Sequence, residues 1–213
     1  LRHYEGAAQM LSANAARYGW GTSITQCAAY ASFDRIGNAQ ILSRVGISFG
    51  GGTADPLRIA KTAWIEDDTW QPLRRWVEET LVEQDWGKSL VALDVMDRVL
   101  YALLYTHLDD AALNAGAGSY SLVAQHLSTW FADQRRWLDA LYKAWVADPE
   151  VGAANAEVIA EVASRTLDAA AEALAPVAAA IDGLIDADTA AALSATIDQV
   201  RTAYGTLTTA KVG

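Results

Sequence analysis

Histidine and glutamate at helical spacing are the residues that could carry chemistry here, because together they ligate carboxylate-bridged di-iron centres. Such centres are built in helical bundles from two Glu-x-x-His motifs and two further glutamates. A spacing of three places both ligands of a motif on one face of a helix. The chain has three histidines: His107 follows Leu104, His126 follows Val123, and His3 has no residue three positions before it. The sequence therefore contains no Glu-x-x-His motif.

Motifs for other common sites are absent too. One cysteine, Cys27, and three scattered histidines provide neither a cysteine pair nor a His-Glu-x-x-His zinc motif. No Gly-x-Ser-x-Gly sequence marks a nucleophile. The run Gly50-Gly51-Gly52 lacks the lysine of a phosphate-binding loop, and simple flexibility explains it.

Composition narrows the classes of partner. The 213 residues include 16 basic and 26 acidic side chains, which gives a formal charge of −10. Nucleic acid and anionic membrane surfaces are therefore not expected partners, because both attract clustered basic residues. The apolar stretch from Ala169 to Ile181 contains Glu172 and Pro176 and falls short of the ~20 residues that cross a bilayer. A single cysteine suits a reducing compartment, and we expect a cytoplasmic protein.

The elements that would position any site are predicted to be helices throughout. Only four prolines occur, and apolar residues recur every three to four positions. Glycine-containing turns and proline near a helix start mark the boundaries, and we expect Thr22 or Ser23 and Ser119 to cap the helices that they begin. The predicted helices run to about Tyr18, from Thr22 or Ser23, from Asp55 for a dozen residues, from Trp70 to Gln84, from Lys88 to about Asn114, from Ser119 to about Val146, to about Ile181 with a kink at Pro176, and from Asp188 onward.

A change in composition after Val146 predicts two parts. All eight tryptophans lie before this point, whereas the remainder is rich in alanine and holds ten acidic residues against three basic ones. We expect residues 1–147 to form a helical bundle and residues 148–213 to form an acidic helical hairpin packed on it. The chain also starts inside a predicted helix without a methionine, so we expect an N-terminal part of the bundle to be missing.

Polar residues interrupt otherwise apolar helix faces. Asp34 and Asn38 lie on the predicted helix that starts near Thr22, and Gln134 lies on the helix that starts near Ser119. Buried polar groups must be hydrogen-bonded or they cost about 1–3 kcal/mol each. We expect these three to bond one another or to pair with Arg35, unless helix rotation places them at the periphery.

Tryptophan is abundant, and large aromatic residues serve either a thick core or a large interface. Core is the simpler expectation for most of the eight. Three of them lie near turns and charged residues, and we expect these to contact another subunit: Trp64, Trp70 and Trp76.

Ordered motifs over about residues 1–147 resemble one family. They are Ser23-Ile24-Thr25-Gln26-Cys27-Ala28-Ala29-Tyr30 with Asp34, Trp64 with Asp68-x-Trp70-Gln71-x-x-Arg74, Asp85-Trp86-Gly87, and Arg135-Arg136-Trp137. These motifs resemble the hydroxylase beta subunit of bacterial multicomponent di-iron monooxygenases, which include phenol, toluene, alkene, propane and methane monooxygenases.

The resemblance implies that metal ligands have been lost here. In that family the alpha and beta subunits share a ferritin-like fold, and only alpha keeps the iron ligands. Aligning Asp34 with the Asp-Glu-x-x-His pattern of alpha puts Arg35 and Asn38 at the ligand positions. On the later helix, two registers are open: one gives Gln134 and Trp137, and the other gives Phe131 and Gln134. Many beta chains have glutamate after the Asp-Trp-Gly motif, where this chain has Lys88.

The fold expected from this resemblance is all-α, a ferritin-like helical bundle with additional C-terminal helices. The expected role is a non-catalytic structural beta subunit with no cofactor of its own, bound to a di-iron alpha subunit in a heteromer that pairs with a second copy. The resemblance further implies oxidation of small hydrocarbons with O₂. Electrons would come from NADH through a separate flavin and iron–sulfur reductase, with an effector protein and room for a gamma subunit. From the sequence as a whole we expect aliphatic substrates, and no single residue supports that preference.

Two alternatives remain open from the residues. The first is a self-sufficient ferritin-like oxidase whose oxygen ligands come from Asp94 and Asp97 together with Glu78, Glu79 and Glu83. A solvated charged face explains these carboxylates more simply. The second is a free-standing helical adaptor that binds a partner through a surface rich in tryptophan.

Overall fold

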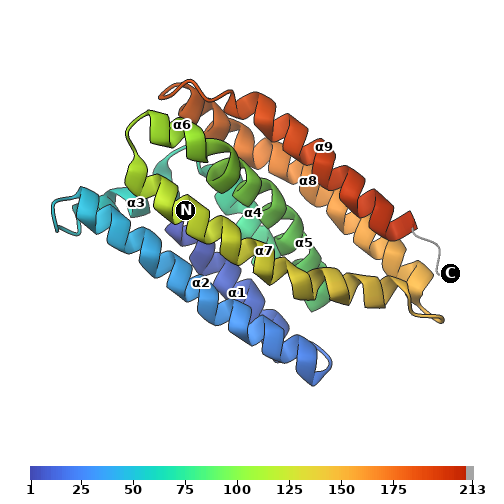
Figure 1. Cartoon of the computed structure of the whole chain (residues 1–213). Coiled ribbons are helices and arrows are strands. Elements are labelled where there is room, and N and C mark those ends of the chain that lie inside the picture. Colours follow the sequence, from blue (N-terminus) through green and yellow to red (C-terminus); the bar gives the residue numbers. More distant parts are fainter. Residues whose placement is uncertain (210–213) are drawn as a thin grey trace.

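The computed structural model describes residues 1–209, and within this range the chain forms helices and no strand (Figure 1). Most boundaries lie within a few residues of those predicted from the sequence. The elements are α1 (Arg2–Tyr18), α2 (Thr22–Phe49), α3 (Asp55–Glu66), α4 (Gln71–Leu81), α5 (Trp86–Tyr101), the π-helix η1 (Ala102–His107), α6 (Leu108–Asn114), α7 (Gly118–Val146), α8 (Gly152–Asp182) and α9 (Thr189–Thr209).

Helix α5 shows how local chemistry sets a helix start. Asp85 precedes the helix, and its carboxylate accepts hydrogen bonds from the backbone N–H groups of Gly87 at 2.8 Å and Lys88 at 3.1 Å. This cap lets the helix begin at Trp86, two residues before the predicted start. At two other helices the predicted side-chain caps are not formed. Helix α2 follows Gly21, whose φ of 104° favours glycine, and α7 begins at Gly118 without a side-chain cap from Ser119.

Replacing Asp85 with alanine should lower the free energy of unfolding by about 1 kcal/mol, because two N–H groups at the start of α5 lose their acceptor. Chemical denaturation of the variant measures this loss. Asp85→Asn is the control, since an asparagine oxygen still caps a helix and should retain most of the stability. Equal losses in both variants would contradict the role of the cap.

Four helices, α1, α2, α5 and α7, form a bundle. Helix α1 packs on α2 and α5, and α7 packs on α2 and α5. The short helices α3 and α4 carry the chain from α2 to α5, so two helix pairs are joined by one long connection (Figure 1). This arrangement brings residues from the beginning, middle and later parts of the sequence to one central position.

A π-helix continues α5 and was not predicted. Over Ala102–His107 the helical turn widens, and α6 then extends the same segment to Asn114, the predicted end. Side chains of α7 bond the carbonyl groups of this turn: the Tyr120 hydroxyl donates to the Leu104 carbonyl, and the Ser128 hydroxyl donates to that of Tyr105 at 3.1 Å. Hydrophobic periodicity does not separate such a turn from an ordinary α-helix, because only one residue is added.

The C-terminal hairpin of α8 and α9 packs on the bundle through α4, α5 and α7. Its buried residues, among them Leu167 and Leu174, belong to the same hydrophobic core as Leu100 of α5. A buried hydrogen bond of 2.6 Å from the Tyr204 hydroxyl to Asp94 joins α9 to α5. The hairpin therefore shares its core with the bundle. The division between residues 147 and 148 stays a prediction.

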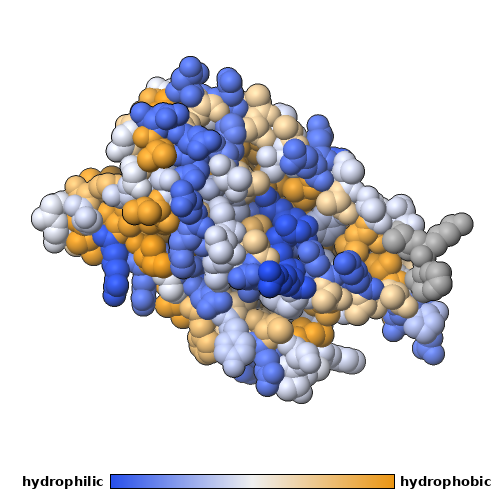
Figure 2. Space-filling view, viewed as in Figure 1, coloured by the Kyte–Doolittle hydropathy of each residue, from blue (hydrophilic) through white to orange (hydrophobic). Residues whose placement is uncertain are grey.

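The face of the molecule that Figure 2 shows mixes polar and hydrophobic residues, and the hydrophobic residues gather in a few places. Figure 2 shows such residues over the end of the molecule at which α2 passes towards α3, where Phe49 and Ile59 are exposed. No side chain of α3 is buried. In the part of the chain that the structure describes, no helix is both long and apolar enough to cross a bilayer.

Candidate functional site

The centre of the four-helix bundle is a cluster of buried polar and charged side chains. We call it the central polar cluster: Tyr4 and Glu5 from α1, Arg35 from α2, and Asp97 and Tyr101 from α5. Each of these residues is at most 2% exposed. An arginine, a glutamate and an aspartate together in a core are unusual, because taking an ion out of water is costly unless partners surround it.

The Arg35 guanidinium is the hub of the central polar cluster. Its Nη1 donates to Glu5 Oε2 at 3.1 Å and to the Tyr101 hydroxyl at 3.2 Å, and its Nη2 donates to Asp97 Oδ2. Two tyrosines complete the bonding, since Tyr101 donates to Glu5 Oε1 at 2.6 Å and Tyr4 donates to Asp97 Oδ1 at 2.7 Å. The guanidinium carbon also lies 4.8 Å from the ring centre of Trp130 on α7, which adds a cation–π contact. The guanidinium of Arg35, which α2 carries, thus contacts side chains of the other three bundle helices.

Burial raises the pKa values of several side chains in the central polar cluster. It raises the pKa of Tyr4 and Tyr101 well above the usual value of a phenol, and the neighbouring carboxylates raise it further, so both hydroxyls remain donors. Burial also raises the pKa of Asp97 to about 7, because the loss of water outweighs the attraction of Arg35.

The raised pKa of Asp97 predicts a pH-dependent stability. The folded state holds this proton more tightly than the unfolded state, where an aspartate titrates near about 4. The resulting stabilisation is complete below about pH 4 and is lost as the pH rises through about 7, with a slope of at most about 1.4 kcal/mol per pH unit. Urea denaturation from about pH 4 to about pH 8 should show this decline in the natural chain and not in Asp97→Asn. Parallel curves for the two proteins would contradict it.

Four of the five residues predicted at lost ligand positions lie at or beside the cluster: Arg35, Phe131, Gln134 and Trp137. Arg35 is its centre, and the ring centre of Phe131 lies 4.5 Å from that of Tyr101. Gln134 and Trp137 of α7 line a small cavity together with Arg35. Asn38 is 3% exposed, and its side-chain nitrogen has no hydrogen-bond partner among the described residues.

The expected pairing of Asp34, Asn38 and Gln134 with one another or with Arg35 was wrong, and for Asp34 the alternative of a peripheral position is confirmed. Asp34 is exposed at the periphery, where its carboxylate accepts a hydrogen bond of 3.0 Å from the Trp130 indole nitrogen. Arg35 bonds neither Asn38 nor Gln134 and pairs instead with Glu5 and Asp97. Glu5 was not predicted at any site, and Asp97 was predicted only as a metal ligand of the alternative oxidase.

The central cavity is too small for a substrate. Its volume is about 10 Å³, room for about one water molecule, whereas small-molecule sites typically measure about 300–1,000 Å³. Asp94 Oδ1, Arg35 Nε and Trp137 Nε1 are buried around it without a partner among residues 1–209.

The alternative carboxylate site is not assembled. On α4, Glu78 and Glu79 are exposed and form ion pairs with Arg74 and Arg75 one turn away. Asp94 on α5 is buried and bonds Arg98 and Tyr204. Over the described range, no group of three or more histidine, cysteine or acidic side chains is placed to hold a metal ion. Salt bridges on one helix surface explain the glutamates of α4.

The tryptophans expected at an interface have different surroundings. Trp76 is 8% exposed and packs in the core of this chain, so its assignment as an interface residue was wrong. Its position on the face of α4 that also carries Val77 points it inward. Trp64 and Trp70 are half-buried, with ring centres 6.4 Å apart, and Trp64 stacks on His3 at 6.0 Å. Their role at an interface stays a prediction.

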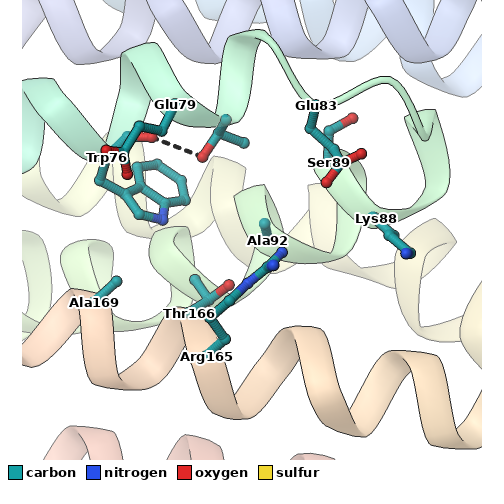
Figure 3. Close-up of a pocket in the computed structure, with 10 residues that line it drawn as sticks. Trp76, Glu79, Glu83, Lys88, Ser89, Ala92, Arg165, Thr166 and Ala169 are labelled. Atoms are coloured by element: carbon teal, nitrogen blue, oxygen red, sulfur yellow. Dashed lines mark hydrogen bonds between the residues drawn. The ribbon is translucent and has the colours of Figure 1, made fainter.

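Several surface grooves are larger than the central cavity, and two of them have charged or aromatic linings. One, between α4, α5 and α8, has a volume of about 240 Å³ and mixed charges, with Glu83, Lys88 and Arg165 in its lining (Figure 3). The other, of about 540 Å³, is lined by Trp20, Trp86 and Trp145. Neither groove reaches the charged residues of the central polar cluster.

The chain is similar in sequence to several known proteins. The family described as Methane/Phenol/Alkene Hydroxylase matches residues 1–149. The chain is 32% identical over 207 residues to the phenol 2-monooxygenase oxygenase component DmpL of Pseudomonas sp. (strain CF600), covering 97% of this chain and 59% of that protein. It is 33% identical over 151 residues to the oxygenase component MhpL of Acinetobacter pittii (strain PHEA-2), covering 70% of this chain and 46% of that protein.

Solved structures show the same fold. Xenon-pressurized phenol hydroxylase from Pseudomonas sp. OX1 superposes with a TM-score of 0.81 at 33% identity, over 94% of this chain and 61% of that one. Toluene 4-monooxygenase with toluene bound superposes with a TM-score of 0.68 at 21% identity, over 91% of this chain and 60% of that one, which supports the fold alone. The protein is thus an all-α, ferritin-like helical bundle with additional C-terminal helices, as predicted. It belongs to the methane/phenol/alkene hydroxylase family.

Proposed function

We propose that this chain is a non-catalytic structural subunit of the hydroxylase component of a multicomponent di-iron monooxygenase. The observation that carries the proposal is Arg35, a guanidinium placed between the carboxylates of Glu5 and Asp97 where the four helices meet. Iron centres in such bundles need glutamates and histidines from facing helices. Where the four helices of this chain meet, Arg35 places a fixed positive charge instead of such ligands.

The donor set of the central polar cluster does not fit a di-iron centre. None of the three histidines of the chain takes part: His3 stacks on Trp64, His107 Nε2 lies 2.6 Å from the Ala187 carbonyl oxygen, and His126 is exposed. A cation already satisfies the two carboxylates. The reaction therefore belongs, in this proposal, to a partner chain that holds the iron.

The relatives suggest the reaction of the whole complex. Two proteins with 32% and 33% identity are named as oxygenase components of phenol 2-monooxygenase. We infer that the complex inserts one oxygen atom from O₂ into a phenol or a similar small aromatic compound, with electrons from NADH supplied through a separate flavin and iron–sulfur reductase. An aromatic substrate replaces the aliphatic preference taken from the sequence alone.

A partner chain needs a surface to bind, and α2 offers one. Of its 28 residues only five are buried, although it is one of the four bundle helices. Tyr30 is 68% exposed, Phe33 is 65% exposed and Ile36 is 44% exposed. These residues follow one another at a spacing of three, which places them on neighbouring positions of one helix side. We call Tyr30, Phe33 and Ile36 the α2 face and assign it to the iron-bearing partner subunit.

Metal analysis of the purified complex tests the proposal. The full-length chain would be co-expressed with its partner subunits, the subunits separated, and the iron in each measured by mass spectrometry. We expect iron in the larger partner and none beyond a trace with this chain. Stoichiometric iron that remains with this chain would overturn the scaffold role and restore the catalytic alternative.

A further inference from the structure

We propose that the central polar cluster is a cation site that the Arg35 guanidinium fills, and that removing this side chain lets the site take a hard divalent cation such as Mn²⁺. The proposal rests on the proposed function, in which the natural chain holds no metal there. It goes beyond that function by naming the class of ion that the site would accept once the Arg35 side chain is removed.

The first observation is that two carboxylates from different helices converge on one point. Glu5 of α1 lies within 3.1 Å of Arg35 Nη1, and Asp97 of α5 contacts Nη2 of the same guanidinium. Glu5 is 0% exposed and Asp97 is 2% exposed, so water does not screen their repulsion. When both carboxylates are ionised, a positive charge between them offsets their repulsion and the cost of their burial.

The second observation is a set of buried polar atoms without partners around this point. Asp94 Oδ1 has none among the described residues, and Asp94 is 1% exposed on the cavity that Arg35 and Asp97 also line. The Tyr105 hydroxyl is likewise buried without a partner within residues 1–209, and its ring centre lies 4.9 Å from that of Tyr101. Polar groups of this kind are rare in cores and commonly mark a bound ion or an ordered water molecule.

The chemistry of these groups selects the kind of ion. Carboxylate and hydroxyl oxygens are ligands for hard cations such as Mg²⁺, Ca²⁺ and Mn²⁺, and the five residues of the central polar cluster include no sulfur or imidazole to favour softer metals. Truncating Arg35 joins the volume of its side chain to the adjacent cavity. The same truncation leaves Glu5 and Asp97 without a counter-ion, which a divalent cation would supply.

Binding of Mn²⁺ to full-length variants tests the proposal by electron paramagnetic resonance, which distinguishes bound from free ion. Arg35→Ala should bind one Mn²⁺ with a Kd on the order of 10⁻⁴ M, as in sites with few charged ligands, and its Tm should rise with Mn²⁺ concentration. The natural chain should bind none. Arg35→Lys retains a positive charge at the position and should also bind none.

Controls separate this site from adventitious binding. Adding Asp97→Asn to Arg35→Ala removes one charged ligand and should weaken Mn²⁺ binding at least about tenfold. If Arg35→Ala folds only in the presence of Mn²⁺, recovery of its helical circular dichroism with Mn²⁺ supports the proposal equally. Arg35→Gln provides a less drastic neutral variant with the same expected binding.

Three outcomes would overturn the inference. Arg35→Ala and Arg35→Gln could fold and bind no Mn²⁺, or an unfolded variant could fail to regain its helices when Mn²⁺ is added. In the third outcome, adding Asp97→Asn leaves Mn²⁺ binding unchanged. These outcomes leave the proposed function untouched, because they concern the variants alone. Stoichiometric metal in the natural chain would instead contradict the proposed function.

Discussion

Replacing Arg35 with methionine should lower the free energy of unfolding by about 3–5 kcal/mol at about pH 8, where Asp97 is ionised. Methionine keeps much of the side-chain volume, so the loss reports charge rather than a cavity. Glu5 and Asp97 would remain buried without a cation, and folding would then have to desolvate or protonate them. Urea denaturation followed by circular dichroism measures the change.

Two further variants define the cause. In the triple variant Glu5→Gln, Arg35→Met, Asp97→Asn, the amide oxygens can still accept hydrogen bonds from the hydroxyls of Tyr101 and Tyr4. This uncharged cluster should recover most of the stability, because neutral replacements of buried ion pairs are commonly tolerated. Arg58→Met is the surface control, since its pair with Asp55 is largely exposed and should contribute little. A triple variant as unstable as Arg35→Met would show that shape, and not charge, holds the cluster together.

The helices could be predicted from the sequence because their signals are local. Hydrophobic spacing, glycine-containing turns and proline near a helix start gave α1, α3 and α8 within a few residues of their observed bounds. The π-helix was missed because one extra residue per turn leaves almost no trace in that spacing. Caps were predicted least well, since Thr22 and Ser119 are plausible cap residues that the structure does not use.

The site could be predicted only in part. The positions of Arg35 and Gln134 came from a family pattern on single helices, and the structure brings both to one small cavity. The partners of Arg35 did not follow, because Glu5 and Asp97 lie 30 and 62 residues away and nothing local links them. Only the packing of α1 and α5 against α2 determines which carboxylates meet the cation. For the same reason, charged surroundings did not reveal that Trp76 points into the core.

Replacing Phe33 with glutamate should disrupt the complex with the iron-bearing partner subunit while the chain itself stays folded. Phe33 is 65% exposed and Tyr30, one turn away, is 68% exposed, so neither contributes much to this chain's own core. Aromatic residues at the centre of an interface commonly contribute about 2 kcal/mol or more to binding, which corresponds to about a 30-fold loss of affinity. A charge on the α2 face would add the cost of burying it without a partner.

Size-exclusion chromatography of co-expressed subunits measures this effect, with hydroxylation of phenol as the second readout. Leu184→Glu is the matched control, because Leu184 is 84% exposed in the connection between α8 and α9, away from α2. The control should assemble and support turnover as the natural chain does, whereas Phe33→Glu should leave the partner alone and lose activity with it. If Phe33→Glu instead unfolds the isolated full-length chain, the α2 face is covered by the chain's own residues. If Phe33→Glu assembles normally, the partner binds elsewhere.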